Sequence, residues 1–276
     1  MKITDVAFII PSHPPHYHYL YNVLNKLHQN NIQIDIFIVF SNQSDYELFQ
    51  LKESIKPIIL TIPLDGNILK SIITQKKYFG LKQLMDSQYD YFIVCDSEMD
   101  IVPENFTPEN IHKKVTNIFL NKQLYASHFN IGGWGIDIAS NCANLFSGDD
   151  YDQIKLATNN FMYYSWFSDI PVYHRTDLRH FFEKINYSNI NFFHFDHLIY
   201  QYYLIVAHNF KVINTSTITN QPDYSLEQLH TNNEDILNKL SDIGYGFGWL
   251  SKHTFNYHSS YFLGKGLFII YHFDRE

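Results

Sequence analysis

A cluster of acidic residues follows a short apolar stretch in the first half of the sequence. Residues 92–95 are four apolar residues in a row, and Asp96, Glu98 and Asp100 follow them within five positions. Such a run predicts a strand that is buried on both faces, as in the middle of a parallel sheet. Carboxylates at the end of a buried strand lie where an open α/β sheet binds its ligands. Because Asp96 and Glu98 are two positions apart, a turned backbone could direct both at one hard cation. Asp100 is expected to be a turn residue instead.

The other candidate residues are polar and lie at the ends of predicted strands and helices. They are Pro11, Ser12 and His13 after a first apolar strand, Lys76 and Lys77 before the acidic strand, Ser97 within the acidic cluster, and Asp169 and Asp196 in the second half. Asp196 begins a segment with helical periodicity, so the helix dipole would stabilise its anionic form and fix its orientation. An aspartate in that place is equally suited to be the N-cap of the helix. For the two lysines, exposure on a helix surface is the alternative to contact with a ligand.

Strand and helix patterns alternate along the first half of the chain. Residues 6–10 and 34–40 are apolar runs of strand length, and residues 17–29 between them have a helical period. This order predicts a βαβ unit with a right-handed crossover. A short strand at 58–60 and a helix at 72–85 follow and lead to the acidic strand. We therefore expect the α/β class, with an open, mostly parallel sheet flanked by helices.

The second half continues with both kinds of element. The patterns predict strands at 124–129, 211–214 and 267–271, an amphipathic segment at 111–121, and helices at 175–185 and 196–208. Residues 41–44 predict a polar turn, and residues 132–135 and 244–249 predict flexible glycine-containing segments. Since no repeat or low-complexity linker marks a boundary, we expect one domain over residues 1–276, with halves at 1–125 and 126–276.

Composition and missing motifs exclude several classes of protein. The 276 residues carry a formal net charge of −8, which argues against general nucleic-acid binding. No G-x-G-x-x-G follows the first strand and no G-x-x-x-x-G-K-[ST] occurs, so dinucleotide-dependent oxidoreductases are disfavoured and P-loop NTPases are excluded. The histidines His13, His16 and His18 suggest zinc only weakly, because two prolines scatter them and no cysteine joins them.

Features of cellular location are few. The two cysteines are Cys95, in the predicted buried strand, and Cys142, so a disulfide framework is not expected and a reducing compartment is favoured. No signal-peptide pattern is visible, and no apolar run approaches the roughly 18 residues that span a bilayer. We expect a cytoplasmic protein, and peripheral contact with a membrane stays open.

Three segments, taken in order, resemble the GT-A fold of nucleotide-sugar-dependent glycosyltransferases. Residues 8–12 resemble the first strand and loop that cup the nucleobase in that family. Residues 76–84, together with the strand and acids at 91–98, look like its helix, strand and D-x-D metal motif. Residues 195–212 are similar to the acidic helix start and following turn of inverting members. The resemblance covers about residues 5–215, and here the metal motif is Asp-Ser-Glu.

The resemblance implies a metal-dependent glycosyltransferase that moves a sugar from a nucleotide donor, most simply UDP-linked, to a hydroxyl of a glycan. Residues 1–125 would bind the donor and residues 126–276 the acceptor. The donor would contact Pro11, Ser12, His13, Lys76, Lys77, Asp96, Ser97 and Lys265. A Mn²⁺ or Mg²⁺ ion would be held by Asp96, Glu98 and a late histidine, with His258 favoured over His253 and His272. Asp196 would be the general base of an inverting reaction, and Asp169 would contact the acceptor or the donor sugar.

Two other functions remain in competition with this interpretation. A sugar-1-phosphate nucleotidyltransferase shares the sheet and the need for metal, but residues 11–15 lack the glycine-rich basic loop expected after its first strand. A non-catalytic glycan-binding protein on a degenerate GT-A fold would show the same elements without turnover. Formation of pyrophosphate from UTP would indicate the first, and absence of UDP release from UDP-sugars the second.

Overall fold

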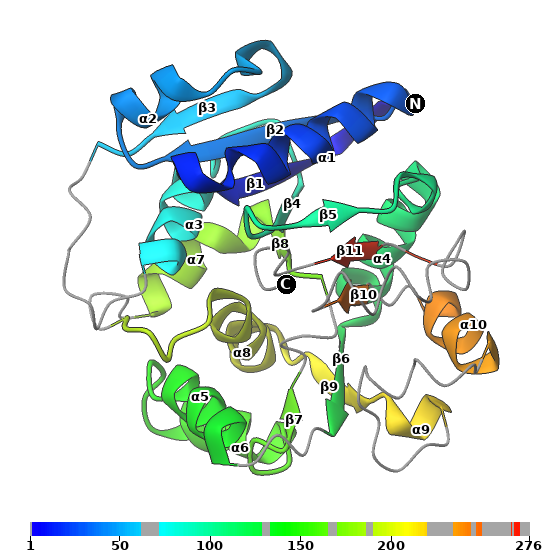
Figure 1. Cartoon of the computed structure of the whole chain (residues 1–276). Coiled ribbons are helices and arrows are strands. Elements are labelled where there is room, and N and C mark those ends of the chain that lie inside the picture. Colours follow the sequence, from blue (N-terminus) through cyan, green and yellow to red (C-terminus); the bar gives the residue numbers. More distant parts are fainter. Residues whose placement is uncertain are drawn as a thin grey trace.

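The computed structural model describes residues 2–61, 72–128, 133–164, 170–185, 190–219, 234–243, 247–249, 266 and 268–270. Helices flank a central sheet that is mostly parallel (Figure 1). In spatial order the sheet contains β3 (Lys56–Ile59), β2 (Gln33–Phe40), β1 (Lys2–Pro11), β4 (Tyr91–Val94) and β8 (Val172–His174). The first four strands are parallel, and β8 pairs antiparallel with β4. The α/β class and the mostly parallel sheet that the sequence predicts are confirmed.

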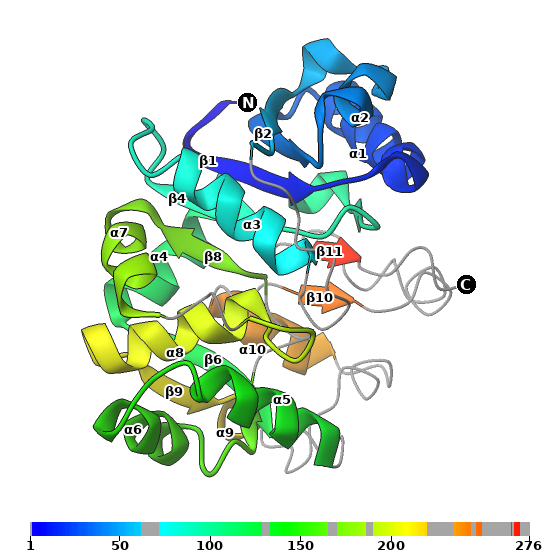
Figure 2. The same ribbon diagram turned by 90° about the vertical axis from the view of Figure 1, so that its left-hand side faces the viewer.

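Helices and two small sheets complete the described part of the chain. The helices are α1 (Tyr17–Gln29), α2 (Gln43–Leu48), α3 (Ile72–Gln83), α4 (Pro108–Asn121), α5 (Gly133–Ala143), α6 (Asp149–Ala157), α7 (Arg175–Lys184), α8 (Asp196–His208), α9 (Ser216–Thr219) and α10 (Glu234–Asp242). One small sheet has the order β10 (Phe247–Trp249), β11 (Phe268–Ile270), β5 (Asp100–Ile101), and the other β7 (Tyr163–Tyr164), β6 (Gln123–His128), β9 (Lys211–Asn214). In both views α8 lies between the central sheet and the pair α5 and α6 (Figures 1 and 2). Within the described residues, no helix combines the length and the apolar character needed to cross a membrane.

Strong periodicity explains why several elements have the predicted bounds. Helix α1 buries Leu20, Val23, Leu24 and Leu27, which are spaced three and four residues apart and so share one face. Helix α8 also has its predicted bounds. Its last residue is His208, and the following Asn209, with a positive φ of 57°, forms a left-handed C-cap. The predicted elements are confirmed here because apolar spacing and terminating residues agree.

The chain reverses direction across the sheet between β3 and β4. From β1 it moves outward through β2 to β3, and it then returns to place β4 on the other side of β1. Ile9 of β1 is paired with Val94 of β4, and the Cys95 N–H donates to the Ile9 carbonyl at 3.1 Å. The residues that follow both strands therefore emerge together, at the kind of switch point where open α/β sheets bind ligands.

The outer flank of the central sheet is formed by β3. Pro57 lies within this strand, which an edge tolerates because one side of the strand has no ladder to complete. Next to it, the Lys56 ammonium lies 2.9 Å from a carboxylate oxygen of Asp35. The sequence predicts this strand at 58–60, and the structure places it two residues earlier at its start.

Three segments differ from the sequence-based predictions. Residues 133–135, predicted as flexible, form the first turn of α5, and this helix packs on α6 and α8. Residues 247–249, also predicted as flexible, pair as β10 with β11. Residues 43–44, predicted as part of a turn, begin α2, because the Asn42 side chain accepts the Asp45 N–H at 2.8 Å and so caps that helix. In the first two cases tertiary contacts override the local glycine signal.

Helix α3 approaches the central sheet closely at Gly80. A methyl group there would lie 2.8 Å from Cγ2 of Ile9 and 2.8 Å from Cγ2 of Val39. Both neighbours are buried β-branched residues, whose side chains have little rotamer freedom. The glycine therefore sets the distance between α3 and the strands β1 and β2.

We expect Gly80→Ala to lower the free energy of unfolding by about 1–3 kcal/mol, because overpacking must be relieved by shifting α3 or the strands. Urea denaturation followed by circular dichroism measures the change. Gln83→Ala, an exposed position at the end of the same helix, is the control and should change stability by less than about 0.5 kcal/mol. A Gly80→Ala protein as stable as the control would show that the gap between α3 and the sheet is not fixed by this contact.

Candidate functional site

The candidate site lies where β1 and β4 end, together with α3 and the first turn of α8. Ser12 and His13 follow β1, Asp96 and Glu98 follow β4, and Asp196 is the first residue of α8. The polar side chains of α3 contact all three segments. Residues far apart in the sequence, such as Ser12, Asp96 and Asp196, are thus brought together near the carboxyl ends of β1 and β4.

The central group of the site is the ammonium of Lys77. Its Nζ lies 2.8 Å from Oδ1 of Asp96 and 3.0 Å from Oδ1 of Asp196. The Lys77 side chain is 8% exposed and that of Asp196 is 3% exposed, whereas Asp96 is partly open to solvent at 26%. A buried cation is therefore shared between the acid that ends β4 and the acid that begins α8. The alternative that Lys77 is an exposed helical lysine is wrong.

Charge fixes the protonation states of Lys77 and Asp196. Burial opposes a charged Lys77, but the attraction of Asp196 and Asp96 outweighs burial and raises the pKa of the lysine above its ordinary value. Burial likewise opposes a charged Asp196, but Lys77 leads the opposing contributions and the pKa of the aspartate falls below its ordinary value. Lys77 and Asp196 are therefore both ionised at neutral pH.

The second oxygen of Asp196 is held by Tyr173 of β8. The Tyr173 hydroxyl donates to Oδ2 of Asp196 at 2.9 Å, and the Tyr78 hydroxyl donates to the Asp196 backbone carbonyl at 3.2 Å. Burial, followed by the charge of Asp196, raises the pKa of each phenol well above its ordinary value, so both remain protonated donors. The N-cap residue of α8 is Phe195, without a side-chain cap, so the alternative role of Asp196 as N-cap is wrong.

A buried cysteine fixes the turn before Asp196. The Phe195 N–H donates to Sγ of Cys142 at 3.3 Å, and the thiol lies 3.7 Å from the Phe193 carbonyl as a donor. Burial raises the pKa of Cys142 to about 12, so the group remains a thiol. Cys142 and Cys95 are both buried, and no disulfide joins them.

Glu98 faces the start of α1. Its Oε2 lies 3.3 Å from Nδ1 of His16 and accepts from the Ser97 hydroxyl at 3.3 Å, while the same Nδ1 is 2.8 Å from the Ser97 Oγ. The ring centroids of His13 and His16 lie 4.0 Å apart. The pKa of His13 is lowered, mainly by burial and then by the charges of His16 and Lys76. This neighbourhood joins the loop after β1 to the loop after β4.

Lys76 lies beside Lys77 in the sequence but has different surroundings. Its Nζ donates to the Ser12 carbonyl at 2.8 Å, and burial lowers the pKa of the lysine. Lys76 is 5% exposed, and within the described residues no ion pair joins it to a carboxylate. The Ser12 Oγ is also buried, and it has no hydrogen-bond partner among the residues that the structure describes. A buried ammonium and an unsatisfied hydroxyl next to each other are suited to binding an anion.

The structure corrects the expectation for Asp100. This residue belongs to β5, is buried, and pairs with the ammonium of Lys26 on α1. A turn residue would remain solvated, whereas Asp100 joins α1 to the small sheet. Lys26 compensates the charge of Asp100. Asp96 and Glu98 contact other residues.

Several predicted site residues lie outside the described residues. They are Asp169, His253, His258, Lys265 and His272. Conversely, the structure reveals Tyr173, Tyr78 and His16 as site neighbours. The sequence carries no local signal for the two tyrosines, and the histidines after β1 point only weakly to zinc.

The acids of the site fit a divalent cation in part. Asp96 and Glu98 offer oxygen atoms, which Mg²⁺ and Mn²⁺ prefer. Within the described part of the chain, however, no three His, Cys, Asp or Glu side chains are placed to hold a metal ion. A cation here would need further ligands from a bound substrate or from residues beyond those described.

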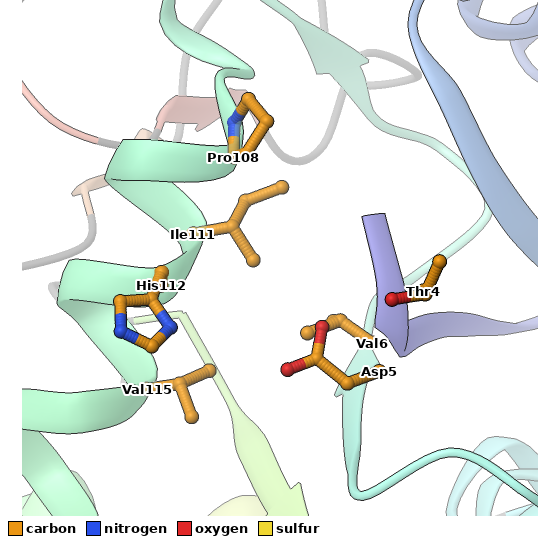
Figure 3. A pocket seen from close by; sticks show the side chains of 7 residues that line it. All are labelled: Thr4, Asp5, Val6, Pro108, Ile111, His112 and Val115. Atoms are coloured by element: carbon orange, nitrogen blue, oxygen red, sulfur yellow. The ribbon is translucent and has the colours of Figure 1, made fainter. Parts of the chain in front are cut away.

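A separate pocket of about 200 Å³ lies at the opposite end of β1 (Figure 3). Thr4, Asp5 and Val6 line it from the strand, and Pro108, Ile111, His112 and Val115 line it from α4. It contains none of the residues at the carboxyl ends of β1 and β4. We assign it no part in the candidate site.

We expect Tyr173→Phe to lower the free energy of unfolding by about 1–3 kcal/mol at neutral pH, because one buried oxygen of ionised Asp196 loses its donor. The folded-state pKa of Asp196 is lowered, so this contribution is present above the unfolded value near 3.8 and is lost as pH falls through the folded value. Urea denaturation at neutral and acidic pH measures both effects. A difference between variant and parent that persists unchanged at acidic pH would contradict the role of the ionised carboxylate.

Comparisons with known proteins find solved structures that are similar to this chain, but no family model and no curated protein. A crystal structure of S. aureus TarS, residues 1–349, is similar over 87% of this chain and 72% of that chain, with 12% sequence identity and a TM-score of 0.40. A likeness of that degree is too low to assign a function or a family to this chain.

Proposed function

We propose that this chain is a metal-dependent GT-A-type glycosyltransferase that moves a sugar from a nucleotide donor, a UDP-sugar, to a hydroxyl of a glycan. The observation that carries the proposal is the gathering of Ser12, Lys76, Asp96, Glu98 and Asp196 at the switch point between β1 and β4. The switch point is the general ligand site of open α/β sheets, and both anion-binding and cation-binding groups lie near it here.

The anion-binding side of the site is suited to the diphosphate of the donor. Lys76 is a buried ammonium whose described contact is the Ser12 carbonyl, and the hydroxyl of the same serine has no hydrogen-bond partner among the described residues. A phosphate oxygen would accept from both groups and would supply the negative charge that a buried lysine requires. Pro11 ends β1 and His13 lies in the loop after it, where Ser97, which follows β4, contacts His16.

The acidic side of the site is suited to the cation that accompanies the diphosphate. Glu98 would be a direct ligand, and Asp96 would bind through water or contact the ribose. Bound Mn²⁺ or Mg²⁺ would supply Lewis-acid stabilisation of the charge that grows on the leaving diphosphate. The assignments of His258 to the metal, Lys265 to the diphosphate and Asp169 to a sugar are part of the proposal.

The chemical step needs a base for the acceptor hydroxyl. As the bond from the anomeric carbon to the diphosphate oxygen breaks, its electron pair leaves with UDP, and the acceptor oxygen forms the new bond. Asp196 would take the proton of that hydroxyl, and attack opposite the leaving group would invert the anomeric centre. Lys77 and Tyr173 hold Asp196 as an anion. The division into a donor half at 1–125 and an acceptor half at 126–276, and the cytoplasmic location, stay predictions.

We expect Lys76→Met to weaken UDP binding in the presence of Mn²⁺ by about tenfold or more, because a charge-assisted hydrogen bond to phosphate is lost. Isothermal titration calorimetry measures the affinity. Lys82→Met removes a lysine from the same helix at a partly exposed position and should leave the affinity within about twofold. Equal losses in the two variants would show that Lys76 does not contact the nucleotide.

Incubation of the protein with a panel of UDP-sugars should release UDP only when Mn²⁺ or Mg²⁺ is present, and chelation with EDTA should stop the release. Asp196→Asn should abolish turnover while UDP still raises the melting temperature, because the carboxamide cannot accept the proton. Circular dichroism checks that the variant is folded.

Other outcomes would replace this function. Pyrophosphate formation from UTP and a sugar phosphate would indicate a nucleotidyltransferase. Binding of glycan without UDP release from any UDP-sugar would indicate the non-catalytic alternative. Unchanged turnover in Asp196→Asn would remove Asp196 from the role of base.

A further inference from the structure

We propose that Lys77 is a positioning residue that acts as an internal cation: it joins Asp96 to Asp196 in the free protein and competes with a divalent ion for Asp96. The inference rests on the proposed function only in treating Asp96 as part of a metal site. It adds a rule for the order of binding, namely that metal binds weakly until the diphosphate is present.

The geometry places the ammonium where it compensates both acids. Nζ of Lys77 is 2.8 Å from Asp96 and 3.0 Å from Asp196, and the trio carries a formal charge of −1. A divalent ion bound to the Asp96 carboxylate would have this ammonium as a near neighbour. Like charges that close repel each other strongly in a partly buried site, so Lys77 lowers the affinity of Asp96 for metal.

The ammonium is held where it is by the packing of α3. Lys77 is buried, and one turn of helix later Gly80 packs directly on Ile9 and Val39 of the sheet. The second acid, Asp196, is itself held by the Tyr173 hydroxyl. Because both ends of the contact are fixed, the lysine cannot simply swing into solvent when a metal ion approaches.

The neighbouring lysine provides a natural contrast. Lys76 is buried to a similar extent: as whole residues, Lys76 is 5% exposed and Lys77 is 6% exposed. The described contact of Lys76, however, is a carbonyl group rather than two carboxylates. The two lysines therefore have separate tasks: Lys76 offers positive charge to an anion, and Lys77 neutralises acids of the protein. A diphosphate at Lys76 would add negative charge beside the trio, and this charge would offset the repulsion between Lys77 and a metal ion.

The test measures Mn²⁺ binding without nucleotide, by electron paramagnetic resonance of the free ion. We expect Lys77→Met to bind Mn²⁺ about tenfold or more tightly than the parent, because two carboxylates lose their shared cation. Lys77→Arg, which keeps the charge, should bind as weakly as the parent. Lys76→Met removes an equal charge one residue away and should change the affinity by less than about threefold.

Two results would overturn the inference. One is a folded Lys77→Met protein with the Mn²⁺ affinity of the parent. The other is an equal gain in Lys76→Met, which would mean that net charge alone sets the affinity. If Lys77→Met does not fold, the double variant Lys77→Met/Asp196→Asn keeps the charge of the trio at −1. It should bind Mn²⁺ more tightly than Asp196→Asn alone, and equal affinities would overturn the inference.

The measurement is independent of the proposed function. Since no nucleotide sugar is present, a protein that fails to release UDP from any UDP-sugar still reports on Lys77. Conversely, if UDP-sugars are turned over and the Mn²⁺ affinities are unchanged, the glycosyltransferase proposal stands and only the role of Lys77 fails.

Discussion

The structure depends on the compensation of one buried positive charge. A lysine that keeps its proton away from water does so against a large desolvation cost, which anions in contact offset. Lys77 has two such anions, one at the end of a central strand and one at the start of α8. The contact therefore fixes how the second half of the chain sits on the first, and the same contact sets the electrostatics of the candidate site. The stability of the fold and the charge of the candidate site are linked through this one group.

Neutral groups complete the hydrogen bonding around Asp196. Tyr173 and Tyr78 donate to the side chain and backbone of Asp196, and Cys142 holds the preceding N–H. Each of these residues comes from a different element, namely β8, α3 and α5. A buried polar network of this kind is specific only when all members are satisfied, because each unsatisfied group carries its own cost. The start of α8 is thus held from three sides.

Much of the fold could be predicted from the sequence, because local patterns determine it. The helical spacing in α1 and the buried runs of β1, β2 and β4 are strong signals, and the structure confirms them. The acids after β4 were predictable at the sheet edge for the same reason: strand ends of a parallel sheet share an edge. The beginning of α5 was not, since glycines in its first turn give the signal of a loop and only packing against α6 and α8 decides otherwise.

The pairings within the site could not be predicted. Lys76 and Lys77 are the same residue type in adjacent positions, yet one meets a carbonyl and the other two carboxylates. The partner Asp196 is 119 positions from Lys77 in the sequence, and Tyr173 lies in β8, a strand whose place at the edge of the sheet has no local signal. Contacts over such separations depend on the final packing of helices on the sheet, which periodicity alone does not specify.

The outer strand of the central sheet has a consequence for behaviour in concentrated solution. β3 presents Pro57, which has no N–H to offer. An extended segment from another molecule would find an interrupted ladder at this strand. Growth of the sheet from one copy into the next is therefore discouraged on this flank, which protects the protein against self-association through backbone pairing.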